Sequence, residues 1–98
     1  MDTREEVKQA LVVETNWLNH FSERLKKYAD RGEREKAITS TDQLKVAYQC
    51  LSDRHTEFWE VSGEQLTDEE FELVSGAEVA MHKALTILRQ FKEQKNEY

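Results

Sequence analysis

The chain has 98 residues, with 14 lysines and arginines against 20 aspartates and glutamates, so its formal net charge is −6. This length fits one domain with a modest core, and the negative charge disfavours direct binding to nucleic acid. No apolar run approaches the roughly 20 residues of a membrane span. The single cysteine, Cys50, excludes an intramolecular disulfide and favours a reducing location. We therefore expect residues 1–98 to form a single soluble, intracellular and cytoplasmic domain.

The first predicted helix begins near Thr3 and ends at Gly32. Thr3 and Glu6 fit a capping box, and Gly32 can adopt the left-handed conformation that ends a helix. Between them, apolar residues recur at spacings of three and four, which places them along one side of an α-helix that must be buried. This stripe consists of Val7, Leu11, Leu18, Phe21, Leu25 and Tyr28.

The second predicted helix begins near Glu33 and ends at Gly63. Residues 39–42 are Thr-Ser-Thr-Asp, which are good capping residues and weak helix formers. The sequence therefore allows either a late start after residue 42 or a long helix with a weak segment, and we favour the long helix. Its apolar stripe consists of Ala37, Leu44, Tyr48, Leu51 and Phe58.

The third predicted helix begins at a second capping box, Thr67 to Glu70, and runs to about residue 95. Its apolar stripe, expected to be buried, consists of Phe71, Val74, Met81, Leu85 and Leu88. Short connections make consecutive helices antiparallel neighbours. The sequence thus predicts an all-α fold, an antiparallel three-helix bundle with long helices.

Small residues form a second pattern on the third helix, where Gly76, Ala80 and Ala84 recur at a spacing of four. Such a strip allows another backbone to approach closely, either a helix of the same chain or a helix of a partner. Trp59 lies next to the core position Phe58, and tryptophan commonly anchors interfaces. We therefore predict that Trp59 and the strip contribute to a partner-binding face.

Acidic residues dominate the stretch between Arg54 and Lys83, which contains no lysine or arginine. This run is either a set of capping and solvated carboxylates or a docking surface for a basic protein. Glu64, Glu69 and Glu72 are the predicted contacts in the second case.

Catalytic, metal and cofactor chemistry find little support. The candidate ligands His20, His55, His82 and Cys50 show none of the close-spaced pairs of structural zinc sites. The three glycines are isolated, so there is no glycine-rich loop for phosphate. The sequence predicts no enzyme activity and no catalytic, metal or cofactor-binding residues.

The order of features resembles the N-terminal helical region of Gag-like polyproteins from BEL/Pao-type retrotransposons. A helix with a basic end precedes the helical segment Leu44 to Phe58, and an acidic break leads to a helix that carries Glu70-Phe71-Glu72. The resemblance covers most of residues 4–91 and implies an assembly module without catalytic residues.

The predicted function is a non-catalytic protein–protein interaction or assembly module, a coiled-coil-like bundle that self-associates through a helix face. The alternative is a small acidic inhibitor of phage type, which blocks a nucleic-acid-binding enzyme by presenting carboxylates in place of phosphates. The predicted partner is a second copy of the chain or a basic protein, with no membrane and no direct nucleic acid contact.

Overall fold

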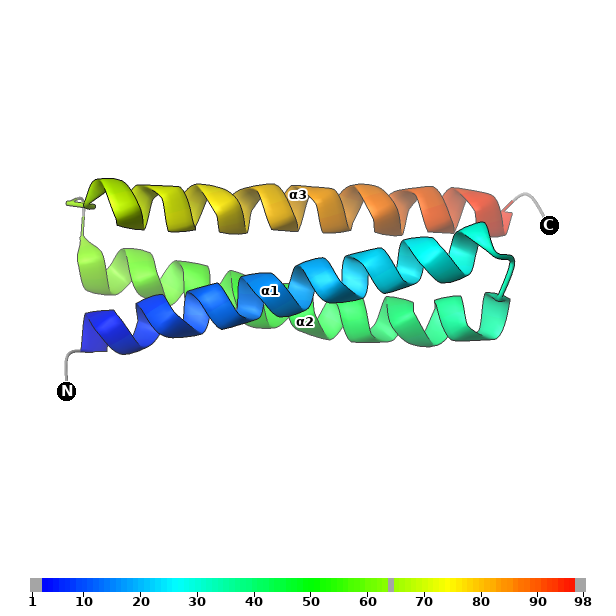
Figure 1. The fold of residues 1–98 in the computed structure, drawn as a ribbon, viewed down its shortest axis with the longest axis horizontal. Coiled ribbons are helices and arrows are strands. Elements are labelled where there is room, and N and C mark those ends of the chain that lie inside the picture. The colour runs from blue at the N-terminus through cyan, green and yellow to red at the C-terminus, as the bar shows by residue number, and fades with distance from the viewer. Residues whose placement is uncertain (1–2, 64, 97–98) are drawn as a thin grey trace.

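Three long helices account for nearly all of the described chain. The computed structural model describes residues 3–63 and 65–96, with side chains described as far as residue 92. The helices are α1 (Thr3–Asp30), α2 (Arg34–Ser62) and α3 (Asp68–Asn96). They run side by side, with the α1–α2 turn at one end and the α2–α3 connection at the other, in a body of 49 × 21 × 17 Å (Figure 1). The predicted all-α three-helix bundle is confirmed.

Glycine ends both of the first two helices, as predicted. Gly32 has a φ of 72°, its N–H donates to the carbonyl of Ala29 at 3.1 Å, and the N–H of Glu33 donates to that of Tyr28 at 2.9 Å. This pair of bonds is the Schellman motif. Gly63 has a φ of 66° and ends α2 in the left-handed region that favours glycine.

Two predictions about where the helices begin have different outcomes. At residues 39–42, α2 continues without a break, and the hydroxyls of Thr39 and Thr41 donate to carbonyls four residues earlier, at 3.2 and 3.0 Å. At the N-terminus, α1 already includes Thr3. Within the described residues no hydrogen bond joins Thr3 to Glu6, so that predicted capping box is wrong.

The core lies mainly between α1 and α2, where large apolar side chains meet. The predicted stripes of these two helices are confirmed, and Phe21, Tyr28 and Tyr48 pack against the core from its edge. The largest fully buried apolar side chains are Leu11, Leu18, Leu25, Leu44, Leu51 and Phe58.

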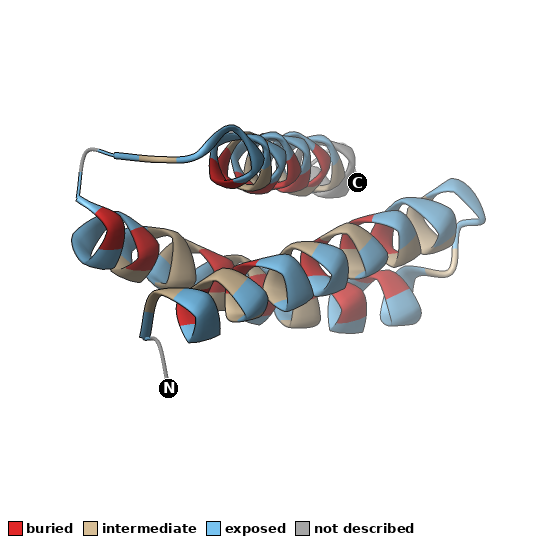
Figure 2. Ribbon diagram, turned by 60° about the vertical axis from the view of Figure 1, so that its left-hand side comes forward, coloured by how far each residue is buried: buried red, intermediate tan, exposed pale blue. Residues whose placement is uncertain are grey.

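The buried side of α3 differs from the prediction. Figure 2 shows that the buried residues of α3 face the layer formed by α1 and α2. Phe71 and Leu85, expected in the core, are 62% and 44% exposed. The reason is that α3 packs more extensively on α1 than on α2 and turns a row of small residues towards them. The buried side chains on α3 include Val74, Ala77, Ala80, Ala84 and Ile87.

Candidate functional site

An exposed row of residues on α3 is the first component of the candidate site. Phe71, Glu78, Leu85 and Lys92 follow one another at intervals of seven residues, so they lie along one side of the helix. All four are exposed. We call them the outer row. Its apolar members have the heptad spacing of a coiled-coil seam, although the chain itself does not cover them.

A polar cluster joins the outer row to α2. Nε2 of His55 lies 3.1 Å from Oε1 of Glu78, and the indole N–H of Trp59 donates to the same Nε2 at 3.3 Å. His55 and Trp59 lie four residues apart on α2, so both project from the same side of that helix. The outer row therefore lies beside Trp59, the aromatic residue that the sequence predicts at an interface.

The two contacts of His55 compete for one nitrogen. When Nε2 carries a proton, it donates to the carboxylate of Glu78, and when it carries none, it accepts from the indole of Trp59. His55 and Glu78 both interrupt the apolar pattern of their helices, and here they pair with each other at the edge between α2 and α3. This pair joins the two helices outside the core.

A basic groove lies between α2 and α3 near the C-terminal end of the outer row. It has a volume of about 530 Å³. Its walls combine the apolar side chains of Leu88 and Phe91 with three cations. No carboxylate lines it, and none of the three cations forms an ion pair within the described part of the chain. Its lining residues are Thr41, Lys45, Leu88, Arg89, Phe91 and Lys92.

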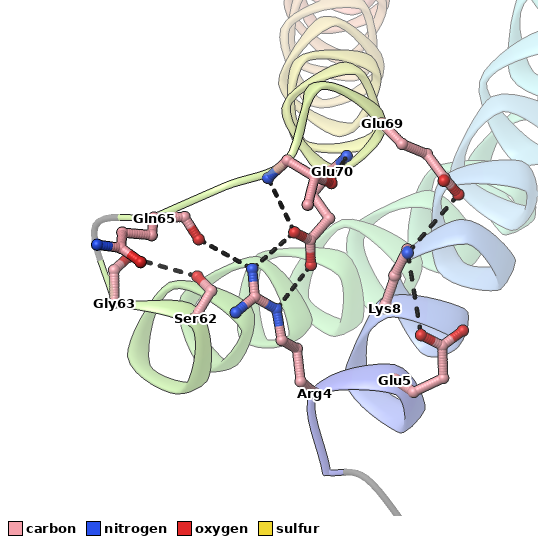
Figure 3. Close-up of polar contacts among 9 residues, drawn as sticks. Arg4, Glu5, Lys8, Ser62, Gly63, Gln65, Glu69 and Glu70 are labelled. Carbon is pink, nitrogen blue, oxygen red and sulfur yellow. Dashed lines mark hydrogen bonds and ion pairs between the residues drawn. The ribbon is translucent and has the colours of Figure 1, made fainter.

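The opposite end of α3 is acidic, and part of its charge is used to hold the bundle together (Figure 3). The guanidinium of Arg4 binds both carboxylate oxygens of Glu70, at 2.7 and 2.6 Å, and also donates to the carbonyl of Gln65 at 2.9 Å. Lys8 lies 3.6 Å from a carboxylate oxygen of Glu69. These contacts join the N-terminal turns of α1 and α3.

The predicted capping box of α3 is present and shares its acidic residue with this ion pair. Oγ1 of Thr67 accepts from the N–H of Glu70 at 3.1 Å, and the carboxylate of Glu70 accepts from the N–H of Thr67 at 3.0 Å. The Arg4 guanidinium, followed by the backbone hydrogen bond from Thr67, lowers the pKa of Glu70 to about 2. Glu70 therefore carries a negative charge at neutral pH and serves the fold.

The predicted small-residue strip does not form a binding face. Ala80 and Ala84 are 2% and 0% exposed, so they already pack inside the chain and cannot contact a partner in the folded state. Gly76 is exposed, and a Cβ added to it would meet no atom within 4 Å. A spacing of four advances more than one helical turn, so the strip drifts around the helix and Gly76 leaves the seam. The partner prediction for Ala80 and Ala84 is corrected to internal packing, and the one for Gly76 stays a prediction.

The other predicted contacts have mixed placements. Trp59, Glu69 and Glu72 are exposed, and Glu69 is paired with Lys8. Glu64 lies outside the described residues. Sequence reasoning missed the basic groove, because Lys45 and Lys92 come together only when α2 and α3 lie side by side. Two members of the outer row, Phe71 and Leu85, were predicted from their spacing, but as core residues.

A second aromatic surface lies on the far side of α1. Trp17 is half exposed and stacks on Phe21, with ring centroids 5.6 Å apart, and His20 contacts both rings at their edges. Trp17 follows Lys8 by nine residues, or about two and a half turns, so it projects from the side opposite α3. Trp17 and Trp59 therefore belong to different surfaces.

The turn end of the bundle has its own polar hollow between α1 and α2. The guanidinium of Arg24 donates to the hydroxyl of Tyr28 at 3.4 Å, and the ammonium of Lys36 lies 5.7 Å from the centre of the same ring. These cations, Arg24 above all, lower the pKa of the Tyr28 hydroxyl. The three residues form a contact network beside the turn and do not touch the outer row.

Comparison of the chain with protein-family models, with curated proteins and with solved structures finds no match. The resemblance to retrotransposon Gag-like proteins therefore stays a prediction. Among the residues that the structure describes, no three histidine, cysteine, aspartate or glutamate side chains come together as metal ligands would. None of the described helices combines the length and the apolar character needed to cross a membrane.

Proposed function

We propose that the chain is a non-catalytic interaction module that assembles by burying a helix face against a second copy of itself. One observation carries this proposal: Phe71 and Leu85 keep the spacing of a core seam but lie uncovered on the outer row. Exposed apolar side chains are common when scattered singly. Two that share a heptad row with a groove at its end have the pattern of an unfilled coiled-coil contact.

The surroundings of the outer row support an interface. Trp59 lies within hydrogen-bond reach of His55, which in turn contacts Glu78 of the row. A large aromatic side chain, a central apolar strip and a charged rim are the usual parts of a protein–protein contact. An intracellular location fits the single unpaired Cys50.

The test compares two glutamine variants on the same helix. Leu85→Gln removes an apolar side chain from the outer row, and Val79→Gln removes one that is 68% exposed but lies off the row. We expect Leu85→Gln to raise the dissociation constant for self-association by roughly tenfold or more, since about 1.4 kcal/mol corresponds to a factor of ten. Val79→Gln should leave it unchanged.

Light scattering across a concentration series at low and high salt gives the readout. A wild-type chain that stays monomeric at every concentration would exclude the proposal. Equal effects of the two substitutions would exclude the outer row as the interface.

The second candidate function is an acidic module that occupies the phosphate-binding surface of a nucleic-acid-binding enzyme. It is favoured by the exposed carboxylates at the α2–α3 end, among them Glu60, Asp68 and Glu72. Exposed charges are screened by salt, so such a complex should weaken steeply as salt rises. An apolar self-association contact should respond much less. Charge reversal at Glu69 and Glu72 should weaken the complex with a basic partner.

A further inference from the structure

We propose that two copies associate as an antiparallel two-fold dimer along α3, with Phe71 of each copy seated in the basic groove of the other. This inference rests on the proposed function and specifies its partner, its orientation and its register. Three features of the chain support it: the spacing of the apolar residues on α3, the location of the basic groove, and the charges at the two ends of that helix.

The apolar spacing is complementary to itself when the helix is reversed. Six residues from 71 to 88 alternate at spacings of three and four. If a two-fold axis passes between Val79 and Ala80, each of the six residues faces a member of the same set, and none is left over. In this register Phe71 faces Leu88 and Glu78 faces Met81 of the second copy. Leu85 lies opposite the position of Val74, whose side chain is buried in its own chain and makes no contact across the dimer. A shift by one heptad leaves two of the six without a counterpart.

The basic groove lies where this register places Phe71 of the second copy. Leu88, the residue opposite Phe71, is part of the groove wall, together with Phe91. The ring of Phe71 can contact these two apolar side chains, and the cations Arg89 and Lys92 can lie against its face. An aromatic side chain that is 62% exposed in one copy thus meets an unfilled apolar groove in the other.

The charges on α3 favour the antiparallel orientation. The first turns of the helix carry Asp68, Glu69 and Glu70, and the groove at the other end carries Arg89 and Lys92. A parallel pair would place acid beside acid, whereas an antiparallel pair places acid beside base at both ends of the contact. In the proposed register Asp68 of one copy faces Arg89 of the other, and two-fold symmetry repeats this pair.

The first experiment measures the dimer dissociation constant of Phe71→Gln. Each dimer loses two Phe71 side chains, so we expect the dissociation constant to rise roughly 100-fold. Each factor of ten corresponds to about 1.4 kcal/mol. Val79→Gln is the matched control on the same helix, and circular dichroism checks that the Phe71→Gln monomer folds. An unchanged dissociation constant would overturn the proposal.

A charge-exchange cycle tests the register. Arg89→Asp and Asp68→Arg should each weaken the dimer, and the double variant should recover much of the loss because both pairs are restored in reverse. Each chain is also measured for thermal stability, since Asp68 lies in the first turn of α3, where its charge favours the helix. If the double variant loses as much dimerisation free energy as the two single variants together, the proposed register is wrong.

Spin-label distances test the orientation in a Cys50→Ser background. A label at His82→Cys lies near the proposed axis, with an axial separation of about 8 Å between copies, whereas a label at Gln90→Cys gives about 30 Å. Short distances at both positions would indicate a parallel pair and overturn the inference. If Leu85→Gln weakens the dimer but the measured distances differ from these values, the proposed function stands and the antiparallel register is wrong. If the chain is always monomeric, both the proposed function and this inference are wrong.

Discussion

The two flanks of α3 differ in how far the chain itself completes them. The flank that carries the buried Ala80, Ala84 and Ile87 is closed, and ion pairs such as Arg4–Glu70 connect α3 to α1 at one end. Towards α2, the contact is thinner, and it leaves Phe71, Leu85 and the basic groove open. The same helix thus has one flank that builds the fold and another whose apolar residues are available to a partner. Substitutions on the two flanks should therefore have different effects: those on the closed flank should change the stability of the monomer, and those on the open flank should change self-association.

The largest effect is expected on the closed flank. Ala84→Leu places a larger side chain in a position that is fully buried, so we expect the free energy of unfolding to fall by about 1–3 kcal/mol. Val79→Leu, on the exposed surface of the same helix, should change it by less than about 0.5 kcal/mol. Urea denaturation of both variants checks this contrast. Wild-type stability in Ala84→Leu would mean that the flank is looser than its burial indicates.

The ion pair at the end of the closed flank predicts a pH dependence. The pKa of Glu70 is lowered from 4.5 to about 2 in the folded chain, so the unfolded chain binds a proton first as the pH falls. The contribution of Glu70 to stability is therefore complete above about pH 4.5 and is lost between pH 4.5 and about pH 2. The melting temperature of wild type should be higher than that of Glu70→Gln at neutral pH. The difference between the two should shrink as the pH falls through this window.

Glu72→Gln is the matched control for this titration, because Glu72 is exposed on the same helix. A difference between wild type and Glu70→Gln that persists at pH 2 would contradict the assignment of the lowered pKa to the pair with Arg4.

Features of the fold that depend on residues close together in the sequence were predicted well, and those that depend on distant residues were not. Gly32, Gly63 and the Thr67–Glu70 capping box act within a few residues, so the sequence alone located the helix ends to within a residue or two. The side that α3 buries depends on where α1 lies. Alanine occurs on buried and exposed sides of helices alike, so the alanines of α3 do not reveal its buried side in the sequence. The stripe through Phe71 and Leu85 was recognised correctly as periodic and wrongly as core.

The candidate site was harder to foresee for the same reason. His55 and Glu78 are polar residues at positions where the spacing of their helices would place apolar ones, but their pairing depends on the alignment of α2 with α3. Trp59 was identified from its residue type and remains at the edge of the proposed surface. Ala80 and Ala84 were assigned to a partner because a small-residue strip has the same sequence pattern whether the close neighbour is internal or external.

The smallest effect is expected at Gly76, which is exposed on α3. Glycine within a helix costs about 0.5–1 kcal/mol relative to alanine, and the space around Gly76 is open. Gly76→Ala should therefore stabilise the monomer by up to this amount, as measured by urea denaturation, without changing self-association. Gly63→Ala is the control with the opposite sign, because its φ of 66° disfavours any side chain. A destabilised Gly76→Ala would show that another backbone does approach this position, and would make Gly76 a candidate contact again.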